Sequence, residues 1–173
     1  MTGALLTILA LGLAAPPPMG KPVSRADLLA LEKKFDKSIV TFAVDDPMDL
    51  LGNTRGVYVE GYGVVFSTEL SLVPAPALTP FRPTIPRDQV SRVRDKKLTR
   101  VPALKKLMIE LMSASAAALR DLPIQEQIIF GVTLNYWSWE DTAGLPAQIV
   151  IQAPRKTLME REVSESAVRV REF

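Results

Sequence analysis

Residues 56–72 limit most tightly what this chain can fold into. Within them, apolar side chains alternate with polar or smaller ones, which is the period of a strand with one buried face. The side chains expected to face the core are Val64, Phe66, Leu70 and Leu72. This stretch therefore predicts β-structure, and the rest of the chain has to cover its apolar face.

Two glycines, Gly61 and Gly63, interrupt this stretch on either side of Tyr62. Glycine adopts a positive φ angle or a β-bulge without steric cost, so the chain can reverse here. We favour a hairpin centred on Gly61-Tyr62, in which Val59 faces Val64 and Val57 faces Phe66. A bend at Gly63 within one long strand is the alternative.

A second strand pair is predicted nearer the C-terminus. Residues 127–137 alternate with one apolar face made of Ile128, Phe130, Val132, Leu134 and Tyr136, and residues 146–153 alternate again after turn residues at 140–144. These two runs predict a second hairpin. Val168 and Val170 indicate a further edge strand, which Arg169 and Arg171 protect from pairing with other chains.

Two helical regions accompany the strands. Ser24 is positioned to cap the first helix, with Asp27 in its first turn, and an apolar stripe follows at Leu28, Leu31, Phe35, Ile39 and Phe42. The end of this helix is open, because residues 40–44 are rich in β-formers. Residues 87–122 are also helical in pattern, and Pro102 is expected to start a second piece. Its methionines, including Met108 and Met112, are expected to pack in the core.

Together these patterns predict an α+β fold: an antiparallel sheet of two hairpins, with about four to five strands and helices packed on one face. Residues 1–15 contain an uncharged apolar run that ends in small residues, which is typical of a secretory signal peptide. Residues 16–23 are a proline-rich spacer. Residues 24–173 are expected to form a single domain of an exported protein, periplasmic or extracellular, with no membrane span in its mature form.

The chain contains no histidine and no cysteine. Disulfides, thiol nucleophiles, serine–histidine mechanisms and histidine- or cysteine-based zinc sites therefore cannot form. The carboxylates near residues 45–53 fit no calcium-loop spacing and are interpreted as turn residues. No cofactor or metal site is predicted.

Positive charge is concentrated in one segment. Residues 82–106 carry a net charge of +7, whereas the rest of the chain carries −5. A basic helix attracts polyanions, and in an exported protein these are an acidic partner protein or an anionic envelope polymer rather than nucleic acid. The candidate binding residues in this segment are Arg92, Lys96, Lys97 and Arg100. The alternative is a solvated helix face that only maintains solubility.

Trp137 and Trp139 are the second candidate binding feature. Their spacing of two on a predicted strand places both indoles on the same face, where they can stack on a sugar ring or on the apolar surface of a partner. The other interpretation is that they fill the sheet face beneath a helix.

The leading hypothesis is therefore an exported, non-enzymatic binding domain. The alternative is a carboxylate-dependent glycan hydrolase, which needs two acids at a defined separation across a cleft. The candidate acids, named because they flank predicted strands, are Glu60, Glu69, Glu140 and Asp141, and Glu60 and Glu140 are the two selected for substitution.

Overall fold

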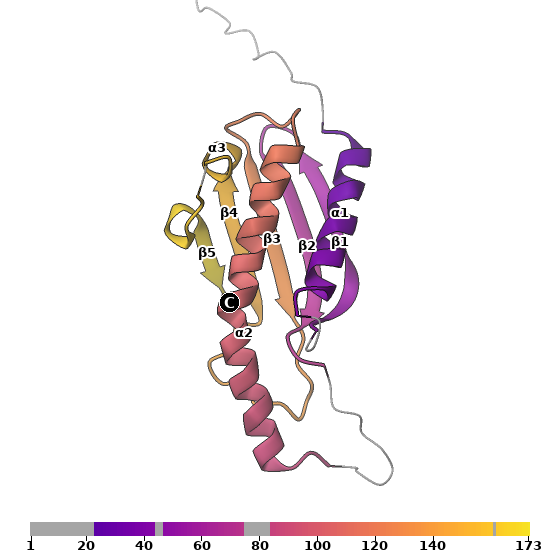
Figure 1. Cartoon of the computed structure of the whole chain (residues 1–173), viewed down its shortest axis with the longest axis vertical. Helices are drawn as coiled ribbons and strands as arrows, with labels where there is room; N and C mark the ends of the chain where they lie inside the picture. Colours follow the sequence, from indigo (N-terminus) through magenta and orange to yellow (C-terminus); the bar gives the residue numbers. More distant parts are fainter. Residues whose placement is uncertain (1–22, 44–46, 75–83, 161) are drawn as a thin grey trace, which may run out of the picture.

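The computed structural model describes residues 23–43, 47–74, 84–160 and 162–173. These residues form a five-stranded sheet with helices α1 and α2 lying across one of its faces, which confirms the α+β class (Figure 1). The elements in chain order are α1 (Arg25–Val40), β1 (Asp49–Val59), β2 (Gly63–Ser71), α2 (Arg87–Ala118), β3 (Gln127–Leu134), β4 (Gln148–Pro154), α3 (Arg155–Leu158), the 3₁₀-helix η1 (Glu165–Ala167) and β5 (Arg169–Glu172).

Both predicted hairpins are present, but the sheet that they form is mixed. The strand order is β1-β2-β3-β4-β5, with antiparallel pairs at β1–β2, β3–β4 and β4–β5. The strands β2 and β3 pair in parallel, which the prediction of an antiparallel sheet did not include. The reason is the connection: α2 runs back along the sheet between β2 and β3, so β3 starts at the same end as β2.

The first hairpin has the predicted position and a different register. Its loop is Glu60-Gly61-Tyr62, so that Val59 pairs with Gly63 and Val57 with Val65. The predicted pairs, Val59 with Val64 and Val57 with Phe66, assumed a two-residue turn and are wrong by one position. Gly61 has a φ of 74° and Gly63 a φ of 139°. At Gly63 the chain also passes so close to β3 that an added Cβ would lie 1.9 Å from the carbonyl oxygen of Gln127.

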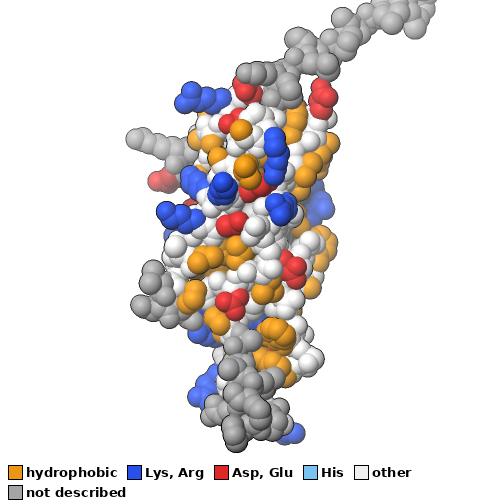
Figure 2. Space-filling view, turned by 90° about the vertical axis from the view of Figure 1, so that its right-hand side faces the viewer, with side chains coloured by type: hydrophobic (Ala, Val, Ile, Leu, Met, Phe, Trp, Pro, Cys, Tyr) orange, Lys and Arg blue, Asp and Glu red, His pale blue; other side chains and the backbone are white. Residues whose placement is uncertain are grey.

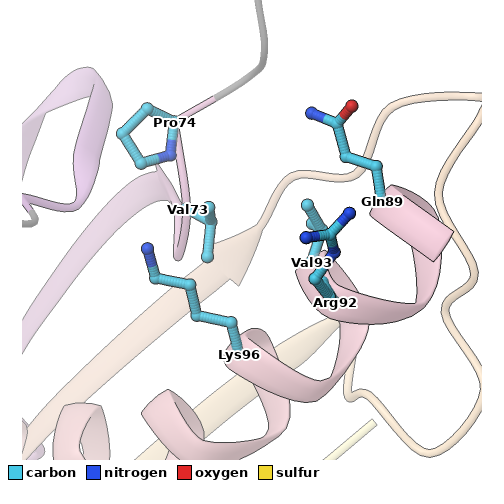
Figure 3. A pocket seen from close by; sticks show the side chains of 6 residues that line it. All are labelled: Val73, Pro74, Gln89, Arg92, Val93 and Lys96. Atoms are coloured by element: carbon cyan, nitrogen blue, oxygen red, sulfur yellow. The ribbon is translucent and has the colours of Figure 1, made fainter. Parts of the chain in front are cut away.

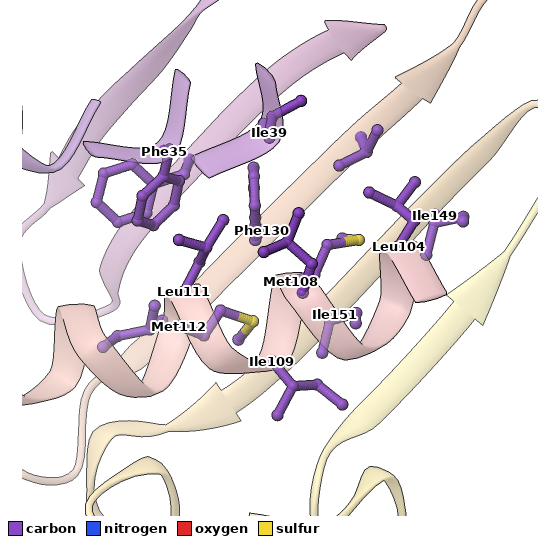
Figure 4. Close-up of a cluster of buried hydrophobic side chains, with 14 of the residues drawn as sticks. Phe35, Ile39, Leu104, Met108, Ile109, Leu111, Met112, Phe130, Ile149 and Ile151 are labelled. Atoms are coloured by element: carbon purple, nitrogen blue, oxygen red, sulfur yellow. The ribbon is translucent and has the colours of Figure 1, made fainter. Parts of the chain in front are cut away.

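The core lies between the sheet and the two long helices. The rings of Phe35 on α1, Phe66 on β2 and Phe130 on β3 meet there, with centroid distances of 4.7 Å from Phe35 to Phe66 and 4.9 Å from Phe35 to Phe130. Met108 and Met112 of α2 are fully buried beside them, as Figure 4 shows, so the prediction that they pack in the core is confirmed. Phe42 is 40% exposed. It leaves the predicted stripe because α1 ends at Val40.

The second helical region is one continuous helix. Pro102 lies inside α2 and does not begin a new helix as predicted. A proline in a helix interior removes one backbone hydrogen bond and costs about 3 kcal/mol. The buried Lys97, Val101 and Leu104 hold the helix on both sides of this position, so tertiary packing offsets that cost. The N-terminal half of α2 extends past the end of the sheet (Figure 1).

The C-terminal strands follow the sequence pattern closely. Ile149, Ile151 and Ala153 of β4 face the core, and β5 is the edge strand with Arg169 and Arg171 exposed. The predicted signal peptide at 1–15 and almost all of the spacer at 16–23 lie outside the described residues. Among the helices that the structure describes, none combines the length and the apolar character needed to cross a bilayer.

Candidate functional site

The basic residues of α2 divide between two faces of the helix. At about 100° per residue, Arg92, Lys96 and Arg100 follow one another along one face, whereas Arg94 and Lys97 lie on a neighbouring face. The first face looks toward the segment that follows β2. The second contacts the loop between β3 and β4, where Arg94 donates to the Ala143 carbonyl at 2.9 Å. The predicted basic site is therefore two different surfaces.

The first face forms one wall of a groove of about 350 Å³. Arg92 and Lys96 line it from α2 together with Gln89 and Val93, and Val73 and Pro74 form the opposite wall. Figure 3 shows the two cationic side chains one helical turn apart, with Gln89 farther toward the N-terminus of the helix. The groove thus combines two cations and an amide with apolar walls, and none of the described side chains that line it is acidic.

Arg100 positions the second wall of this groove. Its guanidinium donates to the backbone carbonyl of Leu72, directly before Val73, and to that of Pro47 at 3.4 Å. Ser71 adds a buried hydroxyl that donates to the Val73 carbonyl at 2.8 Å. Arg100 therefore holds the chain after β2 against α2, which gives it a structural role whether or not it also binds a ligand as predicted.

The ion pair that Arg92 forms lies at the surface of the protein. The Arg92 guanidinium pairs with Asp88 one turn earlier, and the two side chains are 74% and 66% exposed. Exposed pairs of this kind contribute little to stability, so an anionic ligand can replace Asp88 at low cost. Lys96 points into the space between α2 and Pro74 (Figure 3).

Lys97 is buried and cannot contact a ligand at the surface. Its side chain is fully buried and forms an ion pair with Glu140, with 2.5 Å between Nζ and Oε2. The ammonium also lies 4.7 Å from the centre of the Tyr136 ring and 3.5 Å from the Asn135 carbonyl. Burial, and secondarily the Glu140 carboxylate, raises the pKa of Tyr136 to about 12. The prediction that Lys97 binds a partner is therefore wrong, because Lys97 joins α2 to the β3–β4 loop.

The two tryptophans do not lie on a strand. Strand β3 ends at Leu134, and Trp137 and Trp139 belong to the turn that follows it. The turn forms because Glu140 accepts the Trp137 amide at 3.3 Å while its own amide donates to the Trp137 carbonyl at 2.9 Å. The predicted common strand face therefore does not exist. Trp137 is 47% exposed and Trp139 is partly buried.

The two acids selected for substitution in the hydrolase alternative, Glu60 and Glu140, are far apart, whereas Glu69 lies at the end of β2 beside Thr133, at the same end of the sheet as Glu140 and Asp141. Glu60 lies in the β1–β2 loop, beside the start of β3, and Glu140 lies beyond the end of β3. A strand of this length spans about 23 Å at 3.3 Å per residue, whereas the two carboxyls of a glycosidase are about 5–9.5 Å apart. Within the described residues, no group of three or more acidic side chains is arranged to hold a metal ion.

Acidic residues of α1 form a cluster that the sequence did not reveal. Glu32 is buried and accepts two hydrogen bonds from Arg25, at 2.5 and 3.1 Å, and one from the Gly56 amide at 2.8 Å. Asp36 accepts the Thr54 amide at 2.8 Å. These two carboxylates accept hydrogen bonds from backbone amides of β1. They do so in the part of β1 where register shifts interrupt the pairing of β1 with β2. The hydrogen bond from Arg25, more than any other cause, lowers the pKa of Glu32.

The side of the molecule that carries α1 and β1 has a mixed charge. Lysine and arginine side chains are interspersed there with aspartate, glutamate and hydrophobic side chains (Figure 2). This side therefore offers no continuous field of one sign, and the groove on α2 stays the best candidate site for an anion. Comparisons with known proteins found no family model, no curated protein and no solved structure that matches this chain.

Proposed function

We propose that this protein is an exported, non-enzymatic binding domain that takes anionic groups of an envelope polymer into the groove between α2 and residues 73–74. The observation that carries the proposal is the placement of Arg92 and Lys96 one helical turn apart on the same wall. Guanidinium and ammonium groups bind carboxylate, sulfate and phosphate groups by charge-assisted hydrogen bonds. Of the four basic residues predicted from the sequence, these two are the ones proposed to contact the ligand.

A polymer suits this site better than a single small anion. Two cations in a groove open to solvent give weak attraction for one anionic group, because water and salt screen the charges. A polymer presents many such groups, so binding of neighbouring groups follows at a high effective concentration. The positive charge of residues 82–106 adds long-range attraction before contact.

Heparin, a sulfated polysaccharide, is a suitable first probe. We expect the protein to be retained on a heparin column at low salt, and Arg92→Gln with Lys96→Gln to elute at clearly lower salt. The matched control is Lys33→Gln with Lys34→Gln, which removes two exposed charges from α1. Equal elution of the two double variants would show that only net charge matters, and it would overturn the proposal that the groove is the binding site. Lys97 and Arg100 are left unchanged, because both hold the fold together.

Export rests on the apolar run near the N-terminus and is tested separately. The mass of the mature protein recovered from a secreting bacterial host is expected to correspond to a chain that begins near Ala15. Recovery of the full-length chain from the cytosol alone would refute this part of the proposal.

A surface hollow lined by two glutamates supports glycan hydrolysis as a second candidate function. It measures about 370 Å³, and both Glu110 of α2 and Glu165 of η1 line it, with Lys106 nearby. Glu165 is exposed and pairs with Lys105 at 3.1 Å. A polysaccharide turnover screen is therefore aimed at Glu110→Gln and Glu165→Gln rather than at Glu60 and Glu140. If polysaccharide turnover survives both substitutions, this hollow is not the site of hydrolysis.

A further inference from the structure

The face of the sheet opposite α1 and α2 carries an apolar centre. Side chains that alternate with the core residues point there, and Val65, Ile129 and Val150 of the three central strands are only partly buried. Val57 on the edge strand β1 is 59% exposed. Within the parts of the chain that the structure describes, no helix covers this face (Figure 1). We call these four residues and Gly131 the apolar centre of the open face.

The pairing registers place arginines at both edges of the apolar centre. Arg55 on β1 is level with Ser67 and Gly131, and on the far side Val150 pairs with Arg171 of β5. Arg169 lies two pairs further along and on the same face, opposite Gln152. Strands lie about 4.8 Å apart, so Arg55 and Arg171 are separated by about 19 Å across the sheet.

These dimensions suit one α-helix lying along the strands. A helix with its side chains is about 10–12 Å wide, so its apolar stripe covers β2, β3 and β4 while its flanks reach the arginines. Gly131 has no side chain at the middle of this path, which leaves room for a side chain of the visiting helix. The arginines require that the flanks of that helix carry carboxylates, since guanidinium pairs with carboxylate.

We propose that the open face docks an amphipathic helix of a partner protein, with an apolar stripe flanked on both sides by acidic residues. A second copy of this chain fits less well, because three arginines (Arg55, Arg169 and Arg171) flank the apolar centre and would face like charges, while the acids on the described strands of this face, Asp49 and Glu69, lie toward one end of the sheet. A membrane fits less well, because Glu69, Ser67 and Thr133 on the same face need polar partners that lipid chains lack.

The test uses two synthetic amphipathic peptides of about five helical turns (~18 residues) with the same leucine stripe. One carries glutamate on both flanks and the other carries lysine. We expect the acidic peptide to shift the amide NMR signals of Val65, Ile129 and Val150. The lysine peptide, and Arg171→Glu protein with the acidic peptide, are expected to bind at least about tenfold more weakly. Lys34→Glu, the same charge change on exposed α1, is expected to bind like the unchanged protein.

Several results would overturn the proposal. Equal binding of both peptides, signal changes confined to other faces, or no binding at all would each do so. Concentration-dependent dimers in sedimentation that Ile129→Glu abolishes would identify a second copy as the occupant. Flotation with vesicles of phosphatidylcholine and phosphatidylglycerol that Ile129→Glu abolishes would identify a membrane. The dispersion of the NMR spectrum reports whether each variant is folded, and Ile129→Thr serves as a milder variant if Ile129→Glu is not.

Discussion

Removing either partner of the Lys97–Glu140 ion pair is expected to destabilise the protein strongly, while removing both costs much less. The side chains are 0% and 3% exposed, so neither charge can be hydrated when its partner is lost. Breaking a buried pair by deleting one partner typically costs about 3–5 kcal/mol, whereas apolar replacement of both partners is often close to neutral. We therefore expect Lys97→Met and Glu140→Leu each to lower the free energy of unfolding by about 3–5 kcal/mol.

The double variant is expected to lose about 1–3 kcal/mol, because its remaining losses are the hydrogen bonds to the Asn135 carbonyl and from the Trp137 amide. The single costs would then add up to several kcal/mol more than the cost of the double variant, which is the coupling between the two residues. The opposite result, in which the double variant costs the sum of the singles, would show that the two charges do not stabilise each other.

Urea unfolding at neutral pH measures these differences. The protein has two tryptophans, Trp137 and Trp139, and both lie in the turn that Glu140 closes, so their fluorescence reports directly on this loop. Circular dichroism follows the rest of the fold, and coincident transitions support a two-state analysis. The matched control is the exposed pair, Arg92→Met with Asp88→Leu, which is expected to change stability by less than about 1 kcal/mol. Costs below about 1 kcal/mol for both buried single variants would refute the reasoning.

Two further predictions concern β1 and its hairpin. Because hydrogen bonding lowers the pKa of Glu32 in the folded state, the stability that its ionised form contributes is present above the ordinary glutamate pKa and is lost as the pH falls through the folded value. Glu32→Gln is therefore expected to lower stability most at neutral pH and least in acid, and a pH-independent difference in urea unfolding would contradict this. Gly63→Ala is expected to cost more than the about 1–2 kcal/mol of a positive φ alone, because its Cβ would lie 1.9 Å from the Gln127 carbonyl. Gly61 also has a positive φ, but an added Cβ there would meet open space, so Gly61→Ala should show the φ cost alone. Equal thermal stability of the two variants would show that the clash with Gln127 does not contribute.

Local patterns predicted the elements of the fold well. The alternation of Val64, Phe66 and Leu70 identified the buried face of β2 before any tertiary information, because a strand in a half-buried sheet exposes every second side chain. The Ser24 cap of α1 is equally local: its hydroxyl accepts the Asp27 amide at 3.1 Å. The hairpin register was missed by one position, because two glycines near a turn leave its length undetermined.

The candidate site was much harder to predict. The sequence showed that residues 82–106 are basic, but net charge does not show which cations are paired. Lys97 is buried against Glu140, which lies 43 positions away in the chain, and Arg100 binds the carbonyl of Leu72. The groove walls Val73 and Pro74 carried no signal in the sequence, because they meet Arg92 and Lys96 only after β2 has joined the sheet.

By itself, the sequence determined the kinds of elements and the chemistry that is absent, since periodicity, capping and the lack of imidazole and thiol groups are properties of short segments or of composition. The tertiary structure decided the parallel join of β2 and β3, the uninterrupted course of α2 through Pro102, and the division of one basic segment into a buried anchor and an open groove. Each of these depends on contacts between residues that are distant in the chain, and the free energy of such contacts outweighs local preferences.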